Sequence, residues 1–203
     1  MLKFLASRAY VFWILVLIFV YLYQMGGEDI IFFRKKRYEI DPKAGEKLAD
    51  ALNKFTRSRD FSVMGPTTIE YEGKEYSFDS LLFTYSGLTV LSLQPQIGEI
   101  YTNLSEEEWV KMWEGKCSTF SNPLLDMAGN EKLFREIFRN EGIKYGTTQN
   151  LVVFTNNHAN VVASRNVPAC HVKNLDAKLS DKVLADNSAN IEGMKAAIEK
   201  YKK

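Results

Sequence analysis

The sequence is poor in the residue types that most metal and cofactor sites need. Two of its 203 residues are cysteines and two are histidines, and none of them stands at a zinc-binding spacing. The chain has no glycine-rich loop that would cradle a phosphate and no dinucleotide-binding fingerprint. Internal repeats and low-complexity tracts are also missing. These absences argue against a zinc centre and a nucleotide-dependent enzyme, and we expect no small-molecule cofactor.

The few cysteines and histidines do not form a catalytic arrangement. Cys170 and His171 are adjacent on a predicted strand, where neighbouring side chains point to opposite faces, so they do not pair as nucleophile and base. His158 lies in an asparagine-rich turn. Cys117 and Cys170 suit a reducing compartment, and the sequence leaves open whether they form a disulfide.

The longest apolar stretch lies near the N-terminus. Ala9 to Tyr23 is a run of fifteen residues without a charge, and it reaches the roughly 20 residues of a spanning helix if Arg8 extends to the interface. Tyr and Trp side chains near both ends are typical of membrane interfaces. A cleaved secretory signal is the alternative, but no small-residue cleavage site follows the run. We predict a transmembrane anchor over residues 1–27.

A basic linker over residues 28–40 follows this segment. Four basic residues follow the span, Arg34-Lys35-Lys36-Arg37, and only two precede it, Lys3 and Arg8. The positive-inside rule therefore predicts a single-pass membrane protein with a cytoplasmic C-terminal domain. The cluster is interpreted as a flank that touches anionic lipid, with a nucleic-acid contact as the alternative.

The rest of the chain carries a slight net negative charge. Six of the 26 basic residues but only two of the 25 acidic residues precede Tyr38. Because non-specific affinity for DNA comes mostly from neutralised phosphates, an acidic domain is a poor general DNA binder. Any nucleic-acid contact must therefore be local.

Residues 41–203 are predicted to form one α/β domain. Asp41-Pro42 opens a helix in which Ala44, Leu48, Leu52 and Phe55 recur at helical spacing. The remaining pattern predicts strands at 61–63, 67–71, 150–156, 161–162 and 169–172, a helix start at 106–109, a loop containing Cys117, a helix over 124–140, and two C-terminal helices separated at Asn187-Ser188.

Residues 78–100 are predicted to hold two apolar strands folded about a loop of Ser86 and Gly87, with a third short strand behind them. In that register Tyr85 pairs with Leu88, and Asp79 lies directly opposite Gln94 with Ser92 diagonally beside them. These three polar side chains converge on one face of an otherwise apolar sheet. Directly opposed side chains are about 5 Å apart at Cβ, which suits the ligands of a divalent ion.

Several short motifs, taken in order, resemble the nuclease-related domain (NERD) family of the restriction-endonuclease-like superfamily. They cover roughly residues 41–179 and comprise Gly45-Glu46, Phe78-Asp79, Ser86-Gly87, Gly98-Glu99-Ile100, Trp109, Asn122-Pro123-Leu124 and Val153-Phe154-Thr155. The resemblance implies a mixed β-sheet flanked by helices.

The resemblance also implies that the metal site is degenerate. It places Asp79 at the position of a metal ligand, whereas Ser92 and Gln94 occupy the positions of a glutamate and a lysine, and Asp126 that of a glutamine. Similar enzymes hold Mg²⁺ with acidic side chains and position water with the lysine. One Asp would hold Mg²⁺ or Mn²⁺ only weakly.

Three functions follow from this pattern. The first is a membrane-anchored pseudoenzyme that binds a nucleic-acid or protein partner through the degenerate domain. The second is an active metal-dependent nuclease in which Asp79 works with Glu99 or Glu46. The third is a structural subunit of a membrane protein complex. Asp79 itself has a purely structural alternative, in which it accepts backbone hydrogen bonds.

Overall fold

The computed structural model describes residues 41–163, 166–183 and 188–203. The chain divides into two compact units, Met1–Ile40 and Asp41–Lys203, and only the second is described below. The predicted anchor at 1–27, with its run from Ala9 to Tyr23, and the basic linker at 28–40 lie outside the described residues. Within those residues, no helix combines the length and apolar character that crossing a membrane requires.

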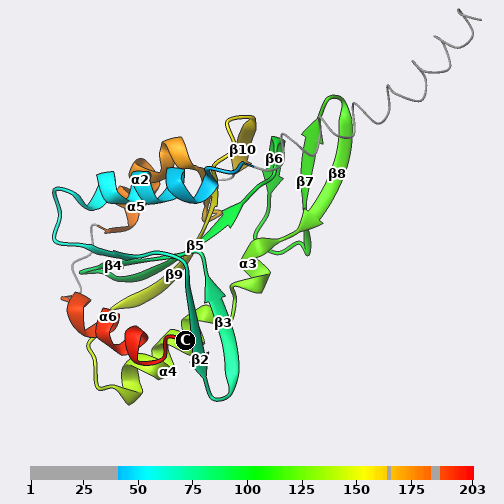
Figure 1. The fold of residues 1–203 in the computed structure, drawn as a ribbon. Coiled ribbons are helices and arrows are strands. Elements are labelled where there is room, and N and C mark those ends of the chain that lie inside the picture. The colour runs from blue at the N-terminus through cyan, green and yellow to red at the C-terminus, as the bar shows by residue number, and fades with distance from the viewer. Residues whose placement is uncertain (1–40, 164–165, 184–187) are drawn as a thin grey trace, which may run out of the picture. The chain divides into compact units, whose positions relative to one another are not determined.

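A mixed five-stranded sheet forms the centre of the domain (Figure 1). Its strands, in spatial order, are β1 (Ser62–Met64), β4 (Ser80–Thr84), β5 (Gly87–Gln94), β9 (Thr147–Phe154) and β11 (Ala169–His171). The first three are antiparallel, whereas β9 is parallel to β5 and β11 is parallel to β9. The predicted α/β class is confirmed at this level.

Two smaller sheets accompany the central one. β2 (Thr67–Tyr71) and β3 (Lys74–Phe78) form a hairpin whose turn at Glu72 and Gly73 has positive φ at both residues. The other sheet has the order β10 (Ala159–Ala163), β6 (Gly98–Thr102), β7 (Glu108–Trp113) and β8 (Lys116–Ser121), with β10 parallel to β6. The predicted short strand behind the hairpin is β6, and it belongs to this second sheet.

Helices cover both faces of the central sheet. Figure 1 shows α2 (Ala44–Thr56) and α5 (Leu175–Val183) on one side, and α4 (Asn130–Asn140) and α6 (Ile191–Lys200) on the other. Each face buries its own cluster because successive strand side chains alternate between faces. Leu91, Leu151 and Val153 pack with α2, whereas Val90, Val152 and Phe154 pack in the cluster that includes α4 and α6.

The helix predicted after Asp41-Pro42 is α2. Its apolar positions Leu48, Leu52 and Phe55 are all buried, as the helical spacing requires for a helix with one face against a sheet. The two predicted C-terminal helices are also present as α5 and α6, and Asn190 caps α6 by accepting a hydrogen bond from the Gly193 N–H.

The predicted hairpin register is wrong by two residues. Thr84 pairs with Gly87 and Phe83 with Leu88, so the loop consists of Tyr85 and Ser86. Gly87 belongs to β5 because its backbone lies against Thr147 at φ 135°, where a side chain would overlap the Thr147 carbonyl. A long-range contact with β9 therefore decides where the turn lies.

Two helix predictions and one loop prediction also need correction. Residues 108–113 form strand β7, whose Trp109 is buried, since pairing with β6 and β8 on its two sides outweighs the acidic helix-start signal. Cys117, expected in a loop, lies on β8. The helix expected over 124–140 is divided into α3 (Pro123–Asp126) and α4, because a turn ending at the N-cap Gly129 separates them.

Candidate functional site

Asp79 lies between β3 and β4, beside the end of β5. Its Oδ2 accepts a 2.7 Å hydrogen bond from the backbone N–H of Leu93. Continuing the observed register by one residue brings Asp79 level with Ser92, and not with Gln94 as predicted. Because the register error is an even number of residues, Asp79 still lies on the same face of the sheet as Ser92 and Gln94, as predicted.

The structure brings Asp79, Ser92 and Gln94 together around one small pocket, here called the Asp79 pocket. Its volume is about 180 Å³. The polar side chains that line it are Ser77, Asp79, Ser92, Gln94, Asp126 and Asn130, and the apolar ones include Phe78, Val90 and Met127. Among the described residues, no lysine or arginine lines this pocket.

The two polar groups on β5 are engaged with each other. Gln94 Nε2 donates a hydrogen bond of 3.1 Å to Ser92 Oγ. The positions that the family resemblance assigns to a glutamate and a lysine thus hold a hydroxyl and an amide, respectively, and neither carries a charge. Asp79 contributes a carboxylate, but one of its oxygens is already occupied by Leu93.

Asp126 brings a second carboxylate to the pocket. Asp126 is the last residue of α3. The N-cap of this helix, Asn122, is buried and accepts a 3.0 Å hydrogen bond from the backbone N–H of Leu124. The Asn122 amide also donates a 2.8 Å hydrogen bond to the Glu106 carbonyl. The sequence predicts a helix from about residue 124, but only the packing of α3 shows that Asp126 reaches the same pocket as Asp79. In the described part of the chain, no three His, Cys, Asp or Glu side chains are grouped as metal ligands.

Glu46 and Glu99 lie elsewhere. Glu46 is exposed on the first turn of α2, which covers the opposite face of the central sheet. Glu99 is exposed on β6 of the second sheet and accepts a hydrogen bond of 2.9 Å from the Tyr101 hydroxyl. Neither residue lines the Asp79 pocket, so the structure does not group them with Asp79.

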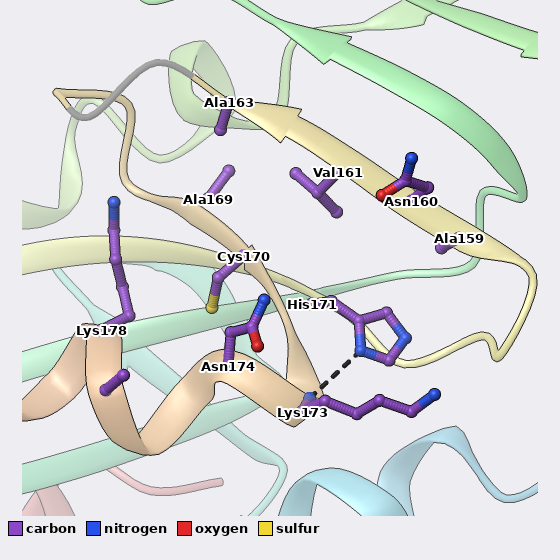
Figure 2. Close-up of a pocket in the computed structure, with 11 residues that line it drawn as sticks. Ala159, Asn160, Val161, Ala163, Ala169, Cys170, His171, Lys173, Asn174 and Lys178 are labelled. Atoms are coloured by element: carbon purple, nitrogen blue, oxygen red, sulfur yellow. Dashed lines mark hydrogen bonds between the residues drawn. The ribbon is translucent and has the colours of Figure 1, made fainter.

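A larger pocket lies between β10, β11 and the start of α5 (Figure 2), and we call it the His171 pocket. Its volume is about 480 Å³. Cys170 and His171 both line it, yet their side chains point apart, as the strand predicts. Cys170 packs against the apolar cluster beneath α2. Both cysteines are free thiols, Cys117 exposed and Cys170 buried.

His171 is buried and uses both ring nitrogens. Nδ1 accepts from the backbone N–H of Lys173 at 3.1 Å, which assigns the proton to Nε2, and Nε2 donates to the Asn156 carbonyl at 3.0 Å. Burial lowers the pKa of His171 below its usual 6.5, and the nearby Lys173 and Lys47 add to the lowering. The imidazole is therefore neutral and holds the corner between β11 and the short helix η1 (Val172–Asn174).

The two pockets differ in the charge of their walls. Carboxylates of Asp79 and Asp126 face the smaller one, whereas Lys173 and Lys178 line the larger one. The sequence predicts neither the pairing of Asp126 with Asp79 nor this pair of lysines. Comparison of the chain with protein-family models, curated proteins and solved structures finds no match.

Proposed function

We propose that residues 41–203 form a nuclease-related domain that does not hydrolyse nucleic acid, and that its Asp79 pocket binds a basic side chain of a protein partner. In this proposal the N-terminal segment anchors the protein in a membrane, with the domain on the cytoplasmic side. The domain then acts as a binding module that is held at the membrane surface.

The architecture supports the family resemblance. A mixed sheet with helices on both faces is the arrangement that the resemblance implies. Asp79 also lies beside the end of β5, where the motif positions should meet. The resemblance itself comes from an ordered set of short motifs.

The chemistry of the pocket argues against hydrolysis. Metal-assisted cleavage needs ligands that hold the ion and a group that positions the attacking water. Ser92 and Gln94 provide a neutral hydrogen-bonded pair in those places. Magnesium prefers carboxylates and retains several waters, so Asp79 with the exposed Asp126 would give only weak occupancy.

The observation that carries the binding proposal is the sign of the charge in the pocket. Asp79 and Asp126 line it together, and no basic side chain from the described part of the chain does. Two carboxylates attract a cation and repel a phosphodiester. Ser92, Gln94 and Asn130 add hydrogen-bonding groups around them. A lysine or arginine of a partner protein matches this lining, whereas a nucleic-acid backbone does not.

A cleavage assay tests the loss of hydrolysis. The full-length chain in nonionic detergent is incubated with plasmid and single-stranded DNA in Mg²⁺ and in Mn²⁺. We expect both substrates to stay intact. Cleavage that disappears in Asp79→Ala would show that the site is active and would overturn the proposal.

A binding assay tests the choice of partner. Fluorescence anisotropy compares a labelled peptide rich in lysine and arginine with a labelled single-stranded oligonucleotide at the same ionic strength. We expect the peptide to bind more tightly than the oligonucleotide. The double variant Asp79→Asn with Asp126→Asn should weaken peptide affinity about tenfold, because losing the two charges removes roughly 1.4 kcal/mol of binding free energy.

The matched control is Glu46→Gln with Glu99→Gln, which removes the same net charge outside the pocket. Peptide affinity should change by less than about twofold in this control, since exposed charge pairs contribute little. An equal loss in both double variants, or tighter binding of the oligonucleotide, contradicts the assignment to the Asp79 pocket.

The membrane anchor and its orientation have a separate test. Sealed vesicles that contain the full-length chain are treated with protease on their cytoplasmic face. The domain should be digested without detergent, because the positive-inside rule places it on that side. Protection until the vesicles are lysed would overturn the orientation, and release of the chain by carbonate washing would overturn the anchor.

A further inference from the structure

The His171 pocket has the size and the place of a ligand site. Its volume of about 480 Å³ falls within the range of roughly 300–1,000 Å³ that is usual for small-molecule pockets. It lies at His171, the carboxyl end of β11, which runs parallel to β9. Ligands of open α/β sheets bind outside the carboxyl ends of the parallel strands.

Small side chains keep this pocket open. The alanines that line it are Ala159 and Ala163 from β10, Ala169 before Cys170, and Ala177 from α5. Figure 2 shows Ala159, Val161 and Ala163 along the β10 wall, facing β11 and the helix. These side chains give the pocket an apolar wall, which we call the alanine slot, and an apolar group can pack against it.

The charged groups at the pocket are of one sign. In Figure 2, Lys178 lies on the left and Lys173 on the right. The Asn174 amide lies between them, and the Asn160 amide lies above. No carboxylate of residues 41–163, 166–183 or 188–203 lines the pocket. Lys178 Nζ donates to the Val167 carbonyl at 2.9 Å. Lys173 is exposed and has no ion pair within the described residues.

His171 fixes the position of Lys173. The ring accepts from the Lys173 backbone N–H, drawn as the dashed line in Figure 2, and is itself tied to the Asn156 carbonyl. The backbone that carries the lysine is therefore held, while its exposed side chain extends beneath the His171 ring in Figure 2. His171 is a positioning residue in this arrangement, because both of its nitrogens are already used.

From this geometry we propose that the His171 pocket binds a small organic anion. The phosphate or carboxylate of the ligand pairs with Lys173, and its flat apolar body occupies the alanine slot. This site is independent of the Asp79 pocket, since the two share no lining residue.

An NMR titration of the full-length chain in nonionic detergent tests the proposal. The chain holds two histidines, so ¹³C-labelled histidine gives a simple spectrum in which the His171 ring reports on the pocket. The probes are phenyl phosphate, inorganic phosphate and benzyl alcohol, added at constant ionic strength. We expect phenyl phosphate to shift the His171 signal and inorganic phosphate to shift it with about tenfold lower affinity. Benzyl alcohol should not shift it.

Variants separate the charge from the slot. Lys173→Gln should weaken the binding of phenyl phosphate about tenfold. Lys74→Gln, which removes the same charge on β3, should leave that affinity unchanged. Ala177→Leu should weaken the binding of phenyl phosphate more than that of inorganic phosphate, because the larger side chain fills the alanine slot while Lys173 is retained. Asp79→Asn with Asp126→Asn should leave this binding unchanged.

Three results would overturn the proposal. They are no shift with either phosphate, equal binding by Lys173→Gln and the wild type, and binding of benzyl alcohol as tight as that of phenyl phosphate. The last would make the slot a purely apolar site. Failure here leaves the peptide assay on the Asp79 pocket unaffected, so the two proposals are tested separately.

Discussion

The Asp79 carboxylate accepts a 2.7 Å hydrogen bond from the backbone N–H of Leu93. The residue at the expected metal position therefore also ties the start of β4 to the end of β5. This contact supports the structural alternative for Asp79 that the sequence left open. It also gives Asp79 a role that needs no metal.

Asp79→Ala should lower the free energy of unfolding by about 1 kcal/mol, because an accepted hydrogen bond is lost at an exposed site. Asp79→Asn retains an acceptor oxygen and should cost less than half as much. Urea unfolding of both full-length variants in detergent, followed by tryptophan fluorescence, measures the difference. Equal stability of Asp79→Ala and the wild type would show that this contact does not contribute.

Gly87→Ala should be among the most damaging single substitutions in the domain. A Cβ at this position would overlap the Thr147 backbone, and φ is 135°, so we expect a loss of about 3 kcal/mol or more from overlap and strain together. Gly45→Ala is the matched control, since nothing lies within 4 Å of its added Cβ. It should be neutral or stabilise α2 by up to about 0.5 kcal/mol. Thermal unfolding of both variants compares them.

The stability of the domain should fall as the pH is lowered through the titration of His171. Burial lowers the pKa of this residue in the folded state, so the unfolded chain takes up the proton first. The stabilisation is complete above the unfolded value of 6.5 and is lost progressively as the pH falls below it.

His171→Asn removes this titration and keeps an oxygen that can accept from the Lys173 N–H. At pH 7.5 it should be less stable by about 1 to 2 kcal/mol, because the hydrogen bond to Asn156 is lost. Between pH 7.5 and 5.5 its unfolding free energy should change less than that of the wild type. Parallel pH profiles of urea unfolding would contradict the role given to His171.

Ser92→Glu combined with Gln94→Lys should create a metal site in the Asp79 pocket. The added carboxylate joins Asp79 and Asp126, and divalent ions bind more tightly as carboxylates are added. We expect Mn²⁺ affinity to rise at least about tenfold, measured as loss of the free Mn²⁺ signal in electron paramagnetic resonance. Ser118→Glu on the exposed strand β8 is the control. An affinity no higher than that of the control would mean that these side chains do not converge.

The sequence predicted the elements better than their pairing. Leu48, Leu52 and Phe55 mark one face of a helix whatever it packs against, and α2 was predicted for that reason. The register of β4 with β5 was wrong because Gly87 is read locally as a turn residue. Only its approach to Thr147 on β9 places it in the strand.

The candidate sites divide in the same way. The sequence placed Ser92 and Gln94 on a common face, since side-chain alternation depends on chain neighbours alone, and Asp79 joins them because the register error is an even number of residues. It gave no sign that Asp126 would face them, or that Lys173 and Lys178 would bracket an alanine slot. The first arrangement brings together elements far apart in the chain, α3 beside β5, and the second depends on how the consecutive elements β10, β11 and α5 pack around one cavity.

The sequence by itself determined the α/β class of residues 41–203, the amphipathic helices, the buried strand at Leu151–Phe154 and the neutral residues at two motif positions. These properties follow from local periodicity and side-chain chemistry. Only the tertiary structure decided the hairpin register, the acidic lining of the Asp79 pocket and the basic lining of the His171 pocket. The first two depend on which distant segments pack together, which is set by the whole core, and the third depends on how the consecutive elements β10, β11 and α5 pack around one cavity.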